Sequence, residues 1–157
     1  MGYKSDFVRA LRAPFAADGV IHRAVVDLTN AQIKALRASP KQLVAAPGAD
    51  LFIQLIDVTL ILNYGSEALT ESTDNMVVQY DGGEAATAAI EATGFIDATA
   101  DTICHTKGAG IAAGAASGIV NKKLELKNSG DGEYAGNASL DTTMRAIVTY
   151  WVQKANL

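Results

Sequence analysis

The sequence predicts a mainly β protein, an antiparallel sandwich or barrel with one or two short helices and an N-terminal arm. Three observations lead to this prediction. Residues 123–127 alternate between charged and apolar side chains, as half-buried strands do. Residues 51–64 are rich in aliphatic and β-branched side chains. Polar turns separate such runs at short spacing, without the strand–helix–strand rhythm of a parallel sheet.

Length and composition fit one domain with an added arm. Of the 157 residues, 49% are hydrophobic, which is enough to bury a core, and the net charge is only −4. No cluster of Lys and Arg could neutralise a row of phosphates, so we expect no nucleic-acid partner. Residues 51–62 form the longest apolar run, which is too short and too interrupted to span a bilayer as a helix. We therefore expect no membrane partner.

The N-terminal segment differs in pattern from the remainder. We divide the chain into an arm, residues 1–24, and a β-rich domain, residues 25–157. Large apolar side chains recur in the arm at nearly helical spacing. Two interpretations stay open: a helix folded onto its own domain, or an arm that docks on a neighbour. In the second, the partner interface consists of Tyr3, Phe7, Leu11 and Phe15.

A short helix is predicted after residue 28. Thr29 can cap it, and Gln32 can reach back to the cap backbone, as in a capping box. Ile33 and Leu36 would form its apolar face, and Pro40 would end it.

The other elements follow from period-two patterns and turn residues. Residues 51–64, as one strand, would be about 46 Å long, so we expect a bend or bulge near Asp57. The alanine-rich residues 84–102 are ambiguous, with a weak helical tendency in their first half. Further strands are expected at residues 41–46, 76–80, 102–106 and 123–127. A terminal strand is expected to face inward with Leu140, Thr142, Met144, Ala146, Val148, Tyr150 and Val152.

Two sequence patterns that imitate catalytic or cofactor sites are rejected. Cys104 and His105 are adjacent, and neighbours on a strand point to opposite faces, so we expect Cys104 in the core and His105 at the surface. Residues 108–113 match a dinucleotide-binding glycine pattern, but no helix and parallel strand follow them, so we interpret them as a loop. With one cysteine and two histidines, we expect no catalytic residues, no metal site, no cofactor and no enzymatic activity.

Several short motifs resemble those of the head decoration, or capsid cement, proteins of tailed bacteriophages. They are a capped helix, a turn and a last strand, within roughly residues 25–154. They comprise residues 28–36 with Pro40, residues 45–48, residues 124–128, Gly136 with Asn137, and Leu140 followed by residues 148–150.

This resemblance implies a jelly-roll-like β domain that binds the outer surface of a phage head and stabilises contacts between capsomers. The implied partners are the major capsid protein and further copies of the chain, as a dimer or trimer. The implied location is the virion, after assembly in the bacterial host cytoplasm, a reducing compartment that suits the single Cys104.

Two other functional classes fit the sequence less well. A receptor- or glycan-binding tip of a phage fibre would also be β-rich, but the predicted loops at residues 65–75, 81–83 and 108–118 contain no aromatic platform. A small hydrolase would need a nucleophile, a base and an orienting group close together, and no such set is evident.

Overall fold

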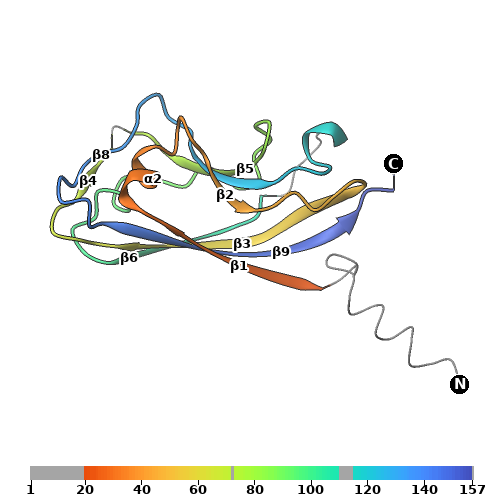
Figure 1. Ribbon diagram of the computed structural model, residues 1–157, viewed down its shortest axis with the longest axis horizontal. Helices are drawn as coiled ribbons and strands as arrows, with labels where there is room; N and C mark the ends of the chain where they lie inside the picture. The colour runs from red at the N-terminus through yellow and green to blue at the C-terminus, as the bar shows by residue number, and fades with distance from the viewer. Residues whose placement is uncertain (1–19, 72, 110–114, 157) are drawn as a thin grey trace, which may run out of the picture.

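The structure, a computed structural model, describes residues 20–71, 73–109 and 115–156. The mainly β, antiparallel fold is confirmed. Two sheets enclose one apolar core, so the domain is a sandwich with separate sheets and not a closed barrel (Figure 1). The large sheet has the order β1 (Ile21–Leu28), β9 (Thr143–Lys154), β3 (Leu51–Asn63) and β6 (Thr102–Lys107); the small sheet has the order β2 (Lys41–Val44), β7 (Leu124–Asn128) and β5 (Met76–Tyr80).

Smaller elements cover the ends of the sandwich. They are α2 (Asn30–Lys34), the 3-10 helix η1 (Ala116–Gly118), and a two-stranded pair, β4 (Leu69–Thr70) and β8 (Ala135–Gly136). The predicted cap of α2 is confirmed: Thr29 and Gln32 form a capping box. Ile33 and Leu36 are both fully buried. No helix within the described ranges is long and apolar enough to cross a membrane.

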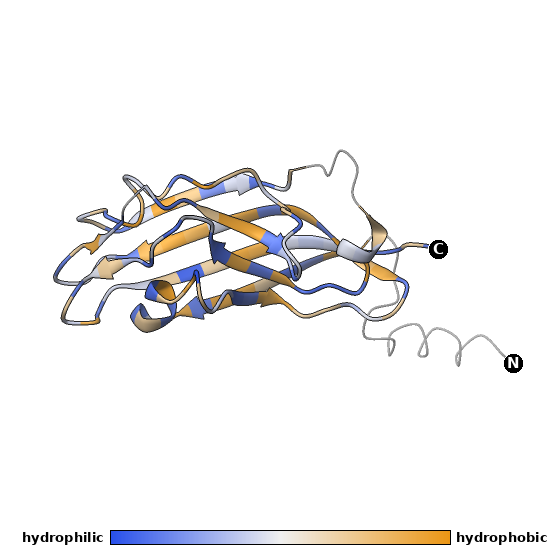
Figure 2. Ribbon diagram, turned by 90° about the horizontal axis from the view of Figure 1, so that it is seen from above, coloured by the Kyte–Doolittle hydropathy of each residue, from blue (hydrophilic) through white to orange (hydrophobic). Residues whose placement is uncertain are grey.

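The core is aliphatic because the inward positions of both sheets are aliphatic. The long strands carry hydrophobic stretches interrupted by hydrophilic residues (Figure 2), and the buried members alternate along β3 and β9. The Tyr80 hydroxyl donates a hydrogen bond to the Ile53 carbonyl, linking the two sheets. Truncating a fully buried side chain such as Leu60 to alanine would cost about 2–5 kcal/mol.

The irregularity expected near Asp57 is present. The register between β3 and β9 shifts between Leu55 and Asp57. Gly108 lies against this bulge: its N–H donates to the Ile56 carbonyl at 2.8 Å, and a Cβ at Gly108 would lie 2.1 Å from the Leu55 carbonyl oxygen. The first glycine of the rejected dinucleotide pattern is thus explained by close packing against β3.

The terminal strand is confirmed with one correction. Six of its predicted inward residues, from Thr142 to Val152, are buried. Leu140, however, is 60% exposed. Its N–H donates to the Asn137 carbonyl at 3.1 Å and its φ is +59°, so it belongs to the turn before β9.

Residues 84–102 contain no helix. Ile90 exchanges two backbone hydrogen bonds with Met76, at 2.9 and 2.7 Å, so the segment runs beside β5.

Residues 21–24, which the sequence assigned to the arm, belong to β1 and pair with β9. The division between arm and domain stays a prediction, because residues 1–19 lie outside the described residues.

Candidate interaction surface

The large sheet has one face in the core and one face that the small sheet does not cover. We call the second the outer face. Its residues alternate with core residues along each strand. The outer face consists of Ile21, Arg23, Val25 and Asp27 of β1; Arg145, Ile147, Thr149 and Trp151 of β9; Asp57, Thr59 and Ile61 of β3; and Ile103, His105 and Lys107 of β6.

The strand register places apolar side chains of the outer face next to each other. Val25 lies opposite Ile147, and Ile61 lies opposite Ile103. Ile103 is 68% exposed, Ile21 60% and Val25 49%. Single exposed hydrophobic residues are ordinary on proteins, but several on one sheet face are typical of an interaction surface.

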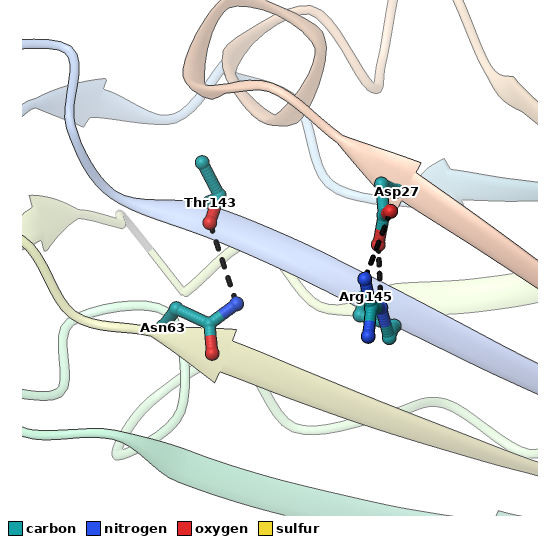
Figure 3. A network of polar contacts seen from close by, with 4 residues as sticks. All are labelled: Asp27, Asn63, Thr143 and Arg145. Atoms are coloured by element: carbon teal, nitrogen blue, oxygen red, sulfur yellow. Dashed lines mark hydrogen bonds and ion pairs between the residues drawn. The ribbon is translucent and has the colours of Figure 1, made fainter.

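One ion pair crosses β1 and β9 on this face. Arg145 contacts Asp27 with two hydrogen bonds, Nε to Oδ1 at 2.6 Å and Nη2 to Oδ2 at 3.0 Å (Figure 3). The hydrogen bond from Arg145 lowers the pKa of the Asp27 carboxyl. Both side chains are exposed, so the pair contributes little to stability and leaves charge available to a partner.

The end of the outer face near Asp27 is a shallow depression of about 260 Å³. Asn63 Nδ2 donates to Thr143 Oγ1 at 3.3 Å within it (Figure 3). Its lining combines this amide–hydroxyl pair and the Asp27–Arg145 pair with Leu28, Thr29 and Met144, so it is mixed in character.

Cys104 and His105 point to opposite sides of β6, as expected. His105 is exposed on the outer face, and its Nδ1 lies 2.9 Å from Thr59 Oγ1. Cys104 is half-buried and packs against the core, and burial raises the pKa of its thiol. The thiol and the imidazole therefore do not form a nucleophile–base pair.

Two acidic side chains between β5 and β6 accept hydrogen bonds from backbone N–H groups. Asp97 accepts a hydrogen bond from the Gly94 N–H at 2.6 Å, and Asp101 accepts one from the Tyr64 N–H at 2.8 Å. Across the described part of the chain, no three His, Cys, Asp or Glu side chains are grouped so that they could hold a metal ion.

A buried polar network lies at the α2 end of the sandwich. Asn137 is fully buried, and its Nδ2 donates to the Glu67 carbonyl at 2.6 Å and to Asp141 Oδ1 at 2.8 Å. This hydrogen bond from Asn137 lowers the pKa of Asp141, with Ser66 adding to the effect. In the sequence, Asn137 appeared only as part of the motif Gly136–Asn137, and no contact was predicted for it.

The predicted interface residues of the arm, Tyr3, Phe7, Leu11 and Phe15, lie outside the described residues. Sequence reasoning missed the outer face instead. The sequence did contain a sign of this face in β1, where Ile21 and Val25 alternate with Arg23 and Asp27 on one side of the strand. Such a mixture of apolar and charged residues is ordinarily interpreted as a solvent-facing side.

Comparison with known proteins found a likeness at the level of structure. No family model matches the chain, and no curated protein matches it. Among solved structures, the chain is similar to one in the capsid of Ralstonia phage GP4, with a TM-score of 0.43 and 12% sequence identity. The alignment covers 87% of this chain and 86% of that chain.

Proposed function

We propose that this chain is a structural protein of a phage virion, a head decoration or cement protein that binds the outer surface of the capsid. The carrying observation is the outer face, where exposed apolar side chains stand on a rigid four-stranded sheet. The motif resemblance described from the sequence supports the same role. In this proposal the partners are the major capsid protein and further copies of the chain.

The proposed mechanism is physical. A protein that binds only the assembled shell stabilises that shell by mass action. Many copies act together, so a modest interface in each copy is sufficient. Burying a side chain such as Ile103 or Ile21 in a contact would contribute about 1.5–3 kcal/mol before ordering costs.

The test compares phage particles assembled with and without the protein. Particles without it are expected to assemble but to release their genome at a lower temperature or on dilution into low salt. Negative-stain images should show dense, symmetric decoration when purified protein is added back. Identical release curves would contradict the proposal, and labelling confined to tail tips would favour the fibre-tip alternative.

Surface variants locate the contact. Ile103→Glu and Ile21→Glu place a charge on the outer face without opening the core, because both side chains are mostly exposed. Ala46→Glu adds the same charge at an exposed position just after β2, away from the outer face, and serves as the matched control. We expect the first two variants to decorate particles at least about tenfold more weakly and the control to bind normally.

A further inference from the structure

Among the described residues, the strand β1 is an edge of the large sheet with one side unpaired. It lies first in the large sheet, and within the described ranges its only strand partner is β9, with a continuous register over all eight residues. Its sequence, IHRAVVDL, contains no proline and no lysine, and its register has no bulge. Proline, lysine and bulges are among the features that block edge-to-edge pairing, and β1 has none of them; its charged side chains are Arg23 and Asp27. The opposite edge, β6, is shorter and ends at Lys107, and beyond it Gly108 forms a bridge with Thr87.

The residues of β1 are complementary to themselves in one antiparallel register. Directly opposite residues in an antiparallel pair have side chains on the same face. When two copies of β1 pair about a two-fold axis at Val25, Arg23 of one copy lies opposite Asp27 of the other, twice over. Val25 then lies opposite Val25, and Ala24 lies opposite Val26.

Neighbouring registers lack this match. An axis at Arg23 or at Asp27 sets like charges against each other, which is unfavourable. An axis at Ala24 sets Arg23 against Val25, and an axis at Val26 sets Asp27 against Val25. Of these five two-fold registers, only the one at Val25 pairs opposite charges.

We propose that β1 pairs with β1 of a second copy in this register, forming a two-fold dimer with one continuous sheet of eight strands. The proposal deepens the self-association included in the proposed function and rests on that part of it. The two outer faces become one surface, and Val25 moves from an exposed edge to its centre. Asp27 keeps its bond to Arg145 and gains Arg23 of the other copy as a second cationic neighbour. Such a contact is isologous and closes at two copies.

The first test is disulfide trapping in a Cys104→Ser background, with purified protein and no particles. In the proposed register the two Val25 Cα atoms lie about 4.5–5.5 Å apart, within reach of a disulfide. Val25→Cys should therefore form a covalent dimer under mild oxidation. Arg23→Cys should not form a covalent dimer, because the two residues at position 23 are offset by four residues along the paired strands, which separates their Cα atoms by about 13 Å. Ile103→Cys, the most exposed apolar position on β6, controls for random collision.

The second test is a charge exchange, measured by sedimentation equilibrium. Arg23→Asp and Asp27→Arg each set like charges opposite each other twice, so each should raise the dimer dissociation constant by at least about tenfold. An equal mixture of the two variants restores both opposite-charge pairs across the dimer and should dimerise at least about tenfold more tightly than either variant alone, although Asp27→Arg still lacks the bond to Arg145. This recovery also shows that both variants are folded.

Three outcomes would overturn the inference: a monomeric chain at micromolar concentration, a trimer, or trapping at Ile103→Cys in preference to Val25→Cys. Each is independent of the capsid assay. A dimer that fails to bind particles would support the β1 pairing and contradict the cement role. Decoration of particles by a monomeric chain would support the cement role and contradict the pairing.

Discussion

Asn30 Nδ2 donates a hydrogen bond to Asn137 Oδ1 at 2.8 Å, although the two residues stand 107 positions apart. Asn30 begins α2, and Asn137 lies just after β8, at a φ of +43°. Asn137 Oδ1 also accepts from the Thr142 N–H at 3.3 Å. One amide therefore connects α2, the small two-stranded pair and the start of β9.

Replacing Asn137 is expected to destabilise the fold strongly. Asn137→Ala removes several buried hydrogen bonds and puts alanine at a left-handed φ, so we expect a loss of about 3 kcal/mol in the free energy of unfolding, measured by urea titration. Asn137→Gly avoids the backbone strain and should lose about 2 kcal/mol. Asn121 has a similar φ, +54°, but is exposed and accepts one hydrogen bond from the Gly48 N–H. Asn121→Ala, the matched control, should cost about 1 kcal/mol; equal losses at both positions would contradict this account.

Stability should fall in alkali because of Tyr80. Burial, with a smaller effect from Glu84, raises the pKa of Tyr80 to about 12. A raised folded-state pKa means that the folded chain holds the proton more tightly than the unfolded chain, whose tyrosine has a pKa of 10.0. The contribution to stability is thus complete below pH 10 and is lost as the pH rises from about 10 towards 12, at about 1.4 kcal/mol per pH unit.

Urea midpoints at a series of alkaline pH values would measure this loss. Tyr80→Phe should be less stable at neutral pH by about 1 kcal/mol, because the hydrogen bond to Ile53 is gone, yet its stability should fall less steeply above pH 10. Burial also raises the pKa of Tyr134, so some slope will remain. A variant as pH-sensitive as the unmodified chain would show that Tyr80 is not the group responsible.

Local patterns predicted the elements whose burial repeats regularly. The capping box at Thr29, the bulge near Asp57 and the five buried positions of β9 all follow from neighbours in sequence. The prediction that Leu140 faces inward was wrong, because the alternating sequence pattern extends into the turn that precedes β9. The turn from Asn137 to Leu140 depends on contacts of Asn137 with distant residues, which no local pattern contains.

The remaining features depend on tertiary pairing. Residues 84–102 have weak helix propensity, and their backbone pairs with β5 instead, through Ile90 and Met76. The outer face becomes an apolar surface only when β1, β9, β3 and β6 are side by side, an order that is not sequential. Ile103 and Val25 come from opposite edges of the sheet, so their common face required the structure.

Cys104 is expected to be dispensable for binding, because its side chain packs against the core and points away from the outer face. Cys104→Ser should decorate particles as the unmodified chain does, provided that circular dichroism shows it folded. Because burial raises the pKa of the Cys104 thiol, alkylation at neutral pH should also be slower in the folded chain than in urea. Loss of decoration in folded Cys104→Ser would assign the thiol a function.

The Asp27 carboxyl should titrate below its ordinary pKa of 3.8, because Arg145 donates to it. Any stability from this pair is present above pH 3.8 and is lost as the pH falls through the folded-state pKa. Carboxyl NMR titration of Arg145→Gln should show the Asp27 pKa rising towards 3.8. Lys107→Gln, which removes a cation from the same face at β6, is the control and should leave the Asp27 pKa unchanged. An unchanged Asp27 pKa in Arg145→Gln would contradict the assignment.

The N-terminal arm is expected to act in association. Tyr3, Phe7, Leu11 and Phe15 place four large apolar side chains on a segment that precedes β1. Burying one such side chain contributes about 1.5–3 kcal/mol, so four could outweigh the cost of ordering the arm. Deleting residues 2–17 should therefore leave a folded, soluble domain that oligomerises less or decorates particles poorly.

A pair of full-length variants separates the apolar side chains of the arm from its charge. Replacing Tyr3, Phe7, Leu11 and Phe15 with serine should reproduce the effect of the deletion, because it removes the apolar stripe and keeps the length. Replacing Lys4, Arg9 and Arg12 with serine should leave decoration unchanged. Decoration should be followed by co-sedimentation with particles, and folding by circular dichroism. If the truncated chain unfolds or aggregates, the stripe belongs to the core of its own domain, because exposed core surface drives aggregation, and the arm then docks in cis.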